Sequence, residues 1–270
     1  MRKIAFIGVG NMAGAIINGA VKNGFLEYSR LILSDRFPAQ CAPYVAKGAV
    51  AAPSPKEAAQ NADCIVLSVK PQNFPEILPQ LAEVEGIRNK LIITIAAGIS
   101  TETIKTALRG APVVRVMPNT PMLIGMGVSA ICSTPDVSAE DFAFARSLFE
   151  ASGSVTVIDE ADMNRIISVT GSSPAYVFSF IDAIYKSALA QGIPDEGMLD
   201  CVCDVVIGAA TLLKKGGLTP EEQIRRVTSK GGTTEQAMRV LADRDFHGVI
   251  MDAMLACTAR AEEMGKQNRG

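Results

Sequence analysis

The sequence predicts an α/β protein, in which a doubly wound sheet is followed by an all-helical C-terminal part. Two observations carry this prediction. Over the first 160 residues, short apolar runs alternate with helical patterns, which indicates a parallel sheet with helices on both faces. From about Ala161 the strand pattern gives way to helical spacing. We therefore predict two domains, 1–160 and 161–270.

Eight apolar runs are predicted to form the strands of the sheet. Most are continuous stretches rich in Val, Ile, Leu and Ala, as expected for strands that are covered by helices on both faces. The predicted strands are 3–8, 31–35, 49–52, 64–69, 91–97, 112–117, 128–133 and 154–159.

Helical patterns separate these strands, and turn-forming residues end them. Asn23-Gly24 stops the first helix and Gly48 the second, because these residue types adopt the left-handed backbone conformation found after helices. The predicted helices of the first domain are 12–22, 38–47, 54–60, 73–83, 100–108 and 138–151.

The second domain is predicted to be helical throughout. A helical pattern covers 163–192, and Pro174 is expected to kink it near Gly171. The apolar faces of these helices predict that the protein dimerises through this domain. Further helices are expected from Pro194 through Asp200–Val206 to Lys215, from Pro220 onward, over 234–242 and over 246–264.

Composition and charge argue against several classes of function. The net charge of -2 gives no attraction to nucleic acid or to anionic lipid. No apolar run reaches the roughly 18 residues of a membrane span. The apolar run after the N-terminus is short and broken by glycines, so it indicates a strand rather than a signal peptide. We expect a cytoplasmic protein that binds neither nucleic acid nor membrane.

The cysteines and the histidine form no recognisable metal-binding pattern. None of the six cysteines belongs to a C-x-x-C pair, and the side chains of Cys201 and Cys203 would point about 200° apart on a helix. His247 is the single histidine. We expect buried thiols and no metal site.

The turn after the first predicted strand carries a clear functional signal. Residues 8–13 fit G-x-G-x-x-G/A, follow a strand directly and open a helix. In such a turn the second glycine lets a pyrophosphate approach the backbone, and the helix N-terminus supplies free N–H groups. The pattern predicts a Rossmann-type NAD(P)-binding domain; a tight turn without a ligand is the alternative. The residues expected at the cofactor are Ile7, Gly8, Val9, Gly10, Asn11 and Met12.

The end of the second predicted strand leaves the choice of cofactor open. Asp35 occupies the position of a carboxylate that usually accepts the ribose 2′-OH of NAD. The adjacent Arg36 suits the 2′-phosphate of NADP, and Ser34 suits either cofactor. Asp35 as a helix cap or a surface charge is the alternative. We expect NADPH or NADH, with a slight preference for NADPH because of Arg36.

Other strand ends are expected to line the cofactor crevice, because the carboxyl ends of parallel strands meet at one edge of the sheet. Two of these residues have simpler alternatives, since Lys70 can be a solvated charge and Asn119 can cap a turn. The expected residues are Val69, Lys70, Pro71, Ala96, Ala97 and Asn119.

A hydroxyl-rich loop interrupts the helical domain. Residues 227–238, VTSKGGTTEQAM, place two glycines among four hydroxyl side chains. Glycine backbone angles can expose consecutive N–H groups at a helix N-terminus, which is a site for an anion. We predict that this loop binds a small carboxylate facing the nicotinamide; the alternative is that Thr233 or Thr234 is an ordinary N-cap. The expected substrate residues are Ser229, Gly232, Thr233 and Thr234.

Over nearly its whole length the sequence resembles the pyrroline-5-carboxylate reductase family. The resemblance implies reduction of the cyclic imine 1-pyrroline-5-carboxylate to L-proline by NADPH or NADH, the last step of proline biosynthesis. It also implies a homodimer, which in this family often assembles into a decamer. The stretches that carry the resemblance are 6–12, 68–72, 95–98, 115–121, 170–178 and the family signature at 227–237.

The predicted chemistry needs no strong acid, because an imine can bind already protonated and accept hydride directly. Thr234 is the expected catalytic residue, with its hydroxyl hydrogen-bonded to the ring nitrogen. A hydroxyacid dehydrogenase would instead need a lysine early in the interdomain helix, where the sequence has none before Lys186. The other alternative, a cofactor-sensing binding protein without activity, is disfavoured by the hydroxyl-rich loop.

Two positions depart from the family pattern. Lys230 stands where the family commonly has proline, which is expected to loosen the loop slightly and to add a cation near it. Gly217 stands in a region where some members carry an acidic residue near the substrate. A carboxylate contact to the substrate nitrogen is therefore left open.

Overall fold

The computed structural model describes residues 2–267, and the chain divides into two compact units. The first unit comprises Met1–Ser172 together with Cys257–Gly270, and the second comprises Ser173–Ala256. Within the first unit, the Ser172 Oγ and the Cys257 Sγ lie 3.2 Å apart. The end of the chain therefore returns to the unit in which it begins.

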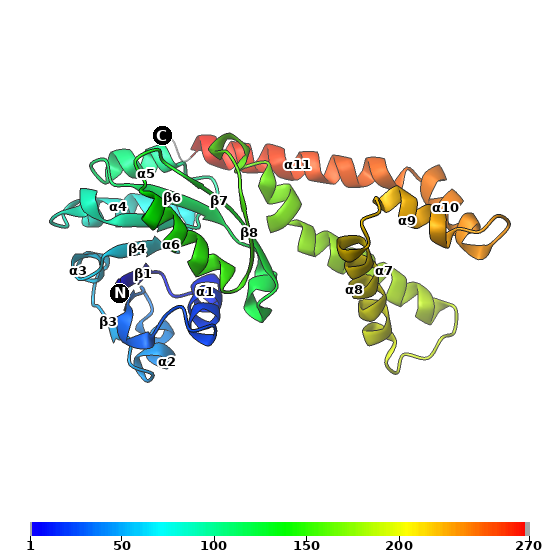
Figure 1. Cartoon of the computed structure of the whole chain (residues 1–270), viewed down its shortest axis with the longest axis horizontal. Helices are drawn as coiled ribbons and strands as arrows, with labels where there is room; N and C mark the ends of the chain where they lie inside the picture. Colours follow the sequence, from blue (N-terminus) through cyan, green and yellow to red (C-terminus); the bar gives the residue numbers. More distant parts are fainter. Residues whose placement is uncertain (1, 268–270) are drawn as a thin grey trace. The chain divides into compact units, whose positions relative to one another are not determined.

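A twisted sheet of eight strands, counted over the described residues, forms the centre of the first unit (Figure 1). Its order is β3-β2-β1-β4-β5-β6-β7-β8, and the first six strands are parallel. The winding reverses between β1 and β4, which confirms the predicted doubly wound fold. The strands are β1 (Ile4–Ile7), β2 (Leu31–Ser34), β3 (Val50–Ala51), β4 (Cys64–Leu67), β5 (Leu91–Thr94), β6 (Val113–Met117), β7 (Gly127–Ser133) and β8 (Gly153–Val157).

The predicted parallel sheet has one exception, which is the pairing of β7 with β6. This strand pairs antiparallel with β6 and parallel with β8. The connection from β6 to β7, residues 118–126, is shorter than the dozen or so residues that a parallel crossover needs. The connection from β7 to β8 contains a helix and is long enough for a crossover, so these two strands are parallel.

Helices cover both faces of the sheet, because the side chains of β1 alternate between two buried clusters. Ile4 and Phe6 pack with α1 and α6 on one face, whereas Ala5 and Ile7 pack with α3, α4 and α5 on the other. The helix expected over 38–47 is reduced to a 3-10 turn and the short α2. The helices are α1 (Asn11–Lys22), α2 (Ala42–Val45), α3 (Pro55–Gln60), α4 (Phe74–Ala82), α5 (Thr101–Ala107) and α6 (Ala139–Glu150).

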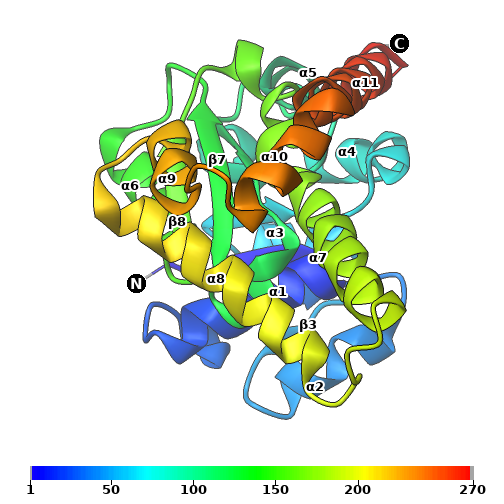
Figure 2. The same ribbon diagram turned by 90° about the vertical axis from the view of Figure 1, so that its right-hand side faces the viewer.

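The second unit is all-helical, as predicted. Its first two helices pack against each other as a hairpin (Figures 1 and 2). Thr219 caps α9 in a capping box with Glu222. The helices are α7 (Ser173–Ala190), α8 (Met198–Gly216), α9 (Pro220–Val227), α10 (Thr233–Asp243) and α11 (Phe246–Gln267), the last of which ends within the first unit.

The kink expected at Pro174 takes another form. A π-helical turn spans Ile167–Gly171, and α7 begins at Ser173. Pro174 therefore lies in the first turn of a helix, where its missing N–H removes no intrahelical hydrogen bond.

Candidate functional site

The turn between β1 and α1 approaches β4 closely, and this approach requires glycine at position 8. Gly8 has a φ of +91°, and a Cβ built on it would lie 2.8 Å from Val69 Cγ1. The Gly8 N–H donates to the carbonyl oxygen of Ser34 at 2.8 Å. Ser68 Oγ donates to the carbonyl oxygen of Gly8 at 2.6 Å. The turn is thus held between β2 and β4.

The N-terminus of α1 is open to an anion. Gly10 is the N-cap, no side chain caps the helix, and its first turn holds no acidic residue. A Cβ built on Gly10 would meet no atom within 4 Å. Open space beside uncapped N–H groups at the positive end of a helix fits a pyrophosphate, so the residues present match the group that the sequence implies.

A cleft of about 610 Å³ lies along the carboxyl ends of β1, β2 and β4. It brings together eight of the predicted cofactor residues, and a neighbouring hollow of about 230 Å³ is bordered by Val9, Gly10 and Asn11. A crevice at the reversal of strand order is where doubly wound sheets bind dinucleotides. The predicted residues that line the larger cleft are Ile7, Gly8, Gly10, Ser34, Asp35, Arg36, Val69 and Lys70.

Some predicted residues border neither hollow, and the sequence analysis missed others that do. Met12 packs on the core of the first unit, and Ala96 is buried in it. Neither Pro71, Ala97 nor Asn119 borders the two hollows. The missed residues follow β2, β3 and β4, and applying the strand-end rule to β3 would have found the turn at 53–55. The missed residues of the larger cleft are Phe37, Gln40, Pro53, Ser54, Pro55, Ser68, Gln72, Asn73, Glu76, Ile77 and Gln80.

Asn119 uses both ends of its side-chain amide within the protein. Its Oδ1 accepts a hydrogen bond from the Val128 N–H at 2.8 Å, and its Nδ2 donates to the carbonyl oxygen of Thr170 at 2.9 Å. Asn119 is 7% exposed. These contacts favour the alternative that it fixes a turn, and its contact with the cofactor stays a prediction.

The carboxylate of Asp35 is oriented by the backbone on either side of it. Its Oδ2 accepts a hydrogen bond from the Val9 N–H at 2.6 Å, and its Oδ1 accepts one from the Phe37 N–H at 2.8 Å. Burial raises the pKa of the nearby Cys41 thiol, and the Asp35 charge raises it further. Asp35 is thus neither a helix cap nor a free surface charge, since it ties the glycine-rich turn to the end of β2.

Two cations lie on the cleft without protein partners. Arg36 and Lys70 are both exposed and both line the cleft. Over residues 2–267 neither side chain has a recorded ion pair or hydrogen bond, whereas Ser34 beside Arg36 is nearly buried. Positive charge at the end of β2 suits a 2′-phosphate.

The double glycine in the second unit builds a tight turn over Ser229–Gly232. The Gly232 N–H donates to the carbonyl oxygen of Ser229 at 3.0 Å, and Gly231 has a φ of +76°. These features describe a type II turn, which requires glycine at its third position and favours proline at its second, here Lys230. A Cβ on Gly232 would lie 2.5 Å from Ser229 Oγ. The geometry of the turn therefore explains the glycine at both positions.

The turn leads directly into α10, whose first N–H groups are unpaired in the described chain. Gly232 is the N-cap and no side chain caps the helix, so the alternative that Thr233 or Thr234 is an N-cap is wrong. Because the Gly232 N–H closes the turn, the backbone N–H groups of Thr233, Thr234 and Glu235 are the ones that lack an acceptor within the described residues. Glu235 Oε2 accepts from the Gly231 N–H at 2.8 Å and braces the turn.

Residues 2–267 contain neither a cluster of metal ligands nor a helix that could span a membrane. In that part of the chain no three His, Cys, Asp or Glu side chains are grouped to hold a metal ion. None of the helices there combines the length and the apolar character needed to cross a bilayer.

Gly217, the second departure from the family pattern, follows α8 with a φ of +66°, which explains a glycine at this position.

Comparisons with known proteins match both halves of the chain. Residues 160–264 match the family model "Pyrroline-5-carboxylate reductase dimerisation", and residues 3–98 match "NADP oxidoreductase coenzyme F420-dependent". A pyrroline-5-carboxylate reductase of Vibrio alginolyticus is 38% identical, with 98% of each chain covered.

Two solved structures are similar over almost the whole chain. The pyrroline-5-carboxylate reductase of Coxiella burnetii is 30% identical with a TM-score of 0.89, covering 97% of this chain and 98% of that one. The pyrroline carboxylate reductase of Plasmodium falciparum, solved with NADP bound, is 25% identical with a TM-score of 0.89 and covers 98% of each chain.

Proposed function

Since the chain belongs to the pyrroline-5-carboxylate reductase family, we propose that it reduces 1-pyrroline-5-carboxylate to L-proline, the last step of proline biosynthesis. The chain is an NAD(P)H-dependent oxidoreductase, and the dinucleotide supplies the hydride when bound. One observation carries the proposal: the helices that begin after Gly10 and after Gly232, each next to a glycine-containing turn, have no side-chain cap and can bind an anion. The first suits a pyrophosphate and the second a small carboxylate.

We assign cofactor binding to residues 1–160 and substrate binding and dimerisation to residues 161–270. The assignment of the cofactor is supported by the cleft beside the glycine-rich turn, which is bordered by Ser34 and Arg36. NADPH is the favoured cofactor, because Arg36 has no partner within residues 2–267 while the Asp35 carboxylate is held by two backbone amides.

The loop Ser229–Thr234 is proposed to hold the substrate carboxylate. The N–H groups of Thr233 and Thr234 at the start of α10 lack protein acceptors in the described residues, and the hydroxyl of Ser229 lies beside Gly232. Charge-assisted hydrogen bonds to a carboxylate are about twice as strong as neutral ones. The turn itself is braced by Glu235, so the loop is ordered before the substrate arrives.

The hydroxyl of Thr234 is proposed to bind the ring nitrogen of the substrate and to orient the C=N bond. An iminium accepts hydride without a proton transfer at the reacting carbon, so the protein has to position the ring and exclude water. No lysine occurs between Ala161 and Lys186, where a hydroxyacid dehydrogenase would need one. The residues present therefore suit an imine better than a ketone.

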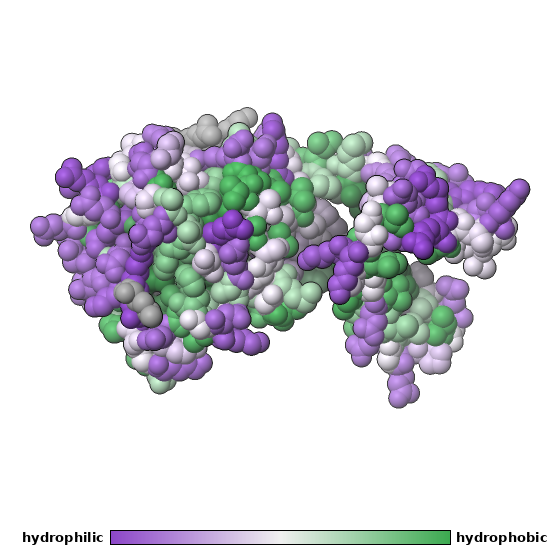
Figure 3. Space-filling model, in the orientation of Figure 1, coloured by the Kyte–Doolittle hydropathy of each residue, from purple (hydrophilic) through white to green (hydrophobic). Residues whose placement is uncertain are grey.

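We further propose a homodimer built through the second unit, with a decamer as the larger assembly. Hydrophobic side chains gather over α7 and α8 in Figure 3. Large exposed apolar patches mark association surfaces. The exposed apolar residues of these two helices are Val177, Phe178, Phe180, Ile184, Leu199, Val205, Ile207, Leu212 and Leu213.

We propose that the reaction takes place in the cytoplasm and, second, that the protein binds neither nucleic acid nor membrane. The net charge of -2 supports the second part, because binding to polyanions needs a basic surface. Cell fractionation that finds the activity in membranes would contradict it.

The absorbance of NADPH during incubation with 1-pyrroline-5-carboxylate tests the proposed function. We expect the absorbance to fall in proportion to the L-proline formed, and NADH to serve less well. No decay with either cofactor, from a protein that binds NADPH, would contradict the proposed substrate.

A further inference from the structure

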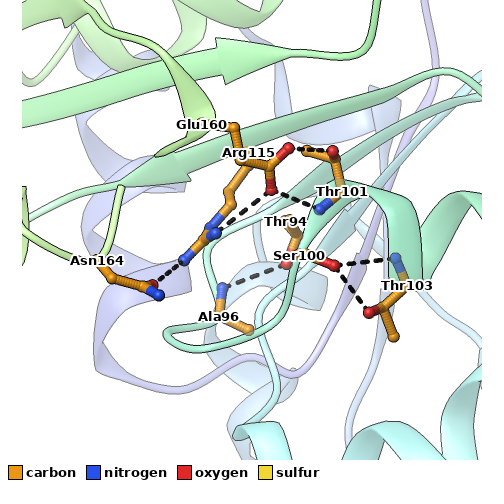
Figure 4. Close-up of polar contacts among 8 residues, drawn as sticks. All are labelled: Thr94, Ala96, Ser100, Thr101, Thr103, Arg115, Glu160 and Asn164. Atoms are coloured by element: carbon orange, nitrogen blue, oxygen red, sulfur yellow. Dashed lines mark hydrogen bonds and ion pairs between the residues drawn. The ribbon is translucent and has the colours of Figure 1, made fainter. Parts of the chain in front are cut away.

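An ion pair between the buried Arg115 and the partly exposed Glu160 lies on the β5–β6 half of the sheet, outside the cleft (Figure 4). Arg115 in β6 is 3% exposed, and its Nη1 lies 3.4 Å from Oε1 of Glu160. Its Nη2 donates to Oδ1 of Asn164 at 3.0 Å, whereas its Nε has no partner in the described chain. A well-packed apolar side chain in place of the buried Arg115 would generally stabilise the core at least as well as its charged pair does. Stability of the core therefore does not explain this pair, whereas its contacts with neighbouring backbone do.

The pair holds the start of α5 through the Glu160 carboxylate. Glu160 Oε1 accepts from the Thr101 N–H at 2.7 Å, and Oε2 accepts from the Thr101 hydroxyl. Thr101 is the first residue of α5. Burial raises the pKa of the Cys132 thiol, which lies opposite Arg115 in β7, to about 12, so this thiol is neutral and does not compete with Glu160 for Arg115.

The loop Ile95–Ser100, between β5 and α5, is fixed at both ends by these contacts. At its start, the Ala96 N–H donates to Thr94 Oγ1 at 3.2 Å. At its end, Ser100 caps α5 and Thr101 is held by Glu160. The backbone of α11 approaches the same place, since a Cβ on Gly265 would lie 3.3 Å from Asn164 Nδ2 and 3.8 Å from the carbonyl oxygen of Gly98.

We propose that Arg115 and Glu160 are positioning residues, which hold the loop Ile95–Ser100 in place for the nicotinamide half of the dinucleotide. The inference rests on the proposed function. In a doubly wound sheet each half of a dinucleotide lies on one set of strands. The cleft at β2, with Arg36, suits the half that carries the 2′-phosphate. The loop after β5 belongs to the strands on the other side of the reversal, β4 to β6, and we expect it to border the nicotinamide half of the dinucleotide.

The test compares two ligands that differ in the nicotinamide. Binding of NADPH and of 2′-phospho-ADP-ribose, which lacks the nicotinamide, is measured by calorimetry for the wild type, Glu160→Gln and Thr101→Val. We expect the Kd of NADPH to rise about tenfold in both variants, the loss that one hydrogen bond produces. The Kd of the fragment should stay unchanged. Because both substitutions disturb the same Thr101–Glu160 pair, their effects should be non-additive, and the double variant should lose less than the two single losses combined.

Lys105→Ala is the matched control. It removes an ion pair with Asp136, 2.7 Å long, on the same helix but away from the loop, and should leave both affinities unchanged. Arg115→Lys, which keeps the charge, should retain more NADPH affinity than Arg115→Met. If both ligands weaken alike in Glu160→Gln and Thr101→Val, or if neither weakens, the proposal is overturned. A wild type that binds NADPH but does not reduce 1-pyrroline-5-carboxylate would contradict the proposed function alone.

Discussion

The carboxylate of Asp35 accepts a hydrogen bond from the Val9 N–H at 2.6 Å, so the end of β2 holds the turn that follows β1. The other carboxylate oxygen accepts from the Phe37 N–H. A carboxylate at this position often selects NADH by accepting the ribose 2′-OH. Here two backbone amides orient it, and the adjacent Arg36 lies on the cleft without an ion-pair partner among the described residues.

Arg36→Ala is expected to weaken NADPH binding about tenfold and NADH binding little, because an exposed charge pair or hydrogen bond to phosphate is lost. Calorimetric Kd values for both cofactors decide the point. Lys70→Ala is the comparison, since Lys70 also lines the cleft but follows β4, and it should not discriminate between the two cofactors. Equal losses for the two cofactors in Arg36→Ala would remove Arg36 from 2′-phosphate recognition.

Thr234→Ala should lower kcat/KM about tenfold, because it removes a hydrogen bond to the ring nitrogen but keeps the backbone N–H. Thr234→Val leaves no hole and should behave alike, whereas Thr234→Ser keeps a hydroxyl and should stay near the wild type. NADPH affinity should be unchanged in all three variants. Turnover at the wild-type rate in Thr234→Ala and Thr234→Val would show that the hydroxyl takes no part in the reaction.

Lys230→Pro should stabilise the protein by about 0.4–1 kcal/mol, because proline presets the backbone angle that the second position of a type II turn requires. The Lys230 N–H has no recorded acceptor in the described chain, so proline costs no hydrogen bond there. Thermal unfolding measures the gain. Lys230→Ala separates the loss of charge from the effect on the turn, and an equal change in both variants would contradict the argument.

The homodimer should depend on the apolar surface of α8. Val205 and Leu212 are 62% and 54% exposed and lie two turns apart on one helix face. Val205→Asp combined with Leu212→Asp should convert the dimer to monomers, as measured by light scattering, while circular dichroism stays helical. Arg88→Asp adds negative charge to the first unit and should leave the dimer intact. A monomeric wild type would contradict the proposed assembly.

Local patterns predicted much of the fold. The glycines at 8 and 10 and the apolar strands identified the doubly wound sheet, because each reflects constraints within a few residues. The antiparallel direction of β7 depends on the length of the connection 118–126, which is too short for a parallel crossover, and an apolar strand pattern does not report strand direction. The return of 257–267 to the first unit depends on contacts distant in sequence, which periodicity does not report.

The candidate site shows the same division. The composition of the hydroxyl-rich loop predicts an anion site. The structure shows why each glycine is there: Gly231 has a positive φ, and Gly232 lies close to Ser229. The partner of Arg115 was not predicted, since Glu160 is 45 residues away and no pattern links the two. The sequence leaves open whether Asp35 is a ribose ligand, a helix cap or a surface charge, because its hydrogen bond to Val9 joins residues 26 positions apart.

The most direct test of the central claim follows the hydride. The protein is incubated with 1-pyrroline-5-carboxylate and NADPH that carries deuterium at both C4 positions, and the product is analysed by mass spectrometry and NMR. The account predicts L-proline with a single deuterium at C5, the ring carbon that formed the C=N bond. Proline without deuterium, or oxidation of NADPH without proline, would contradict the account.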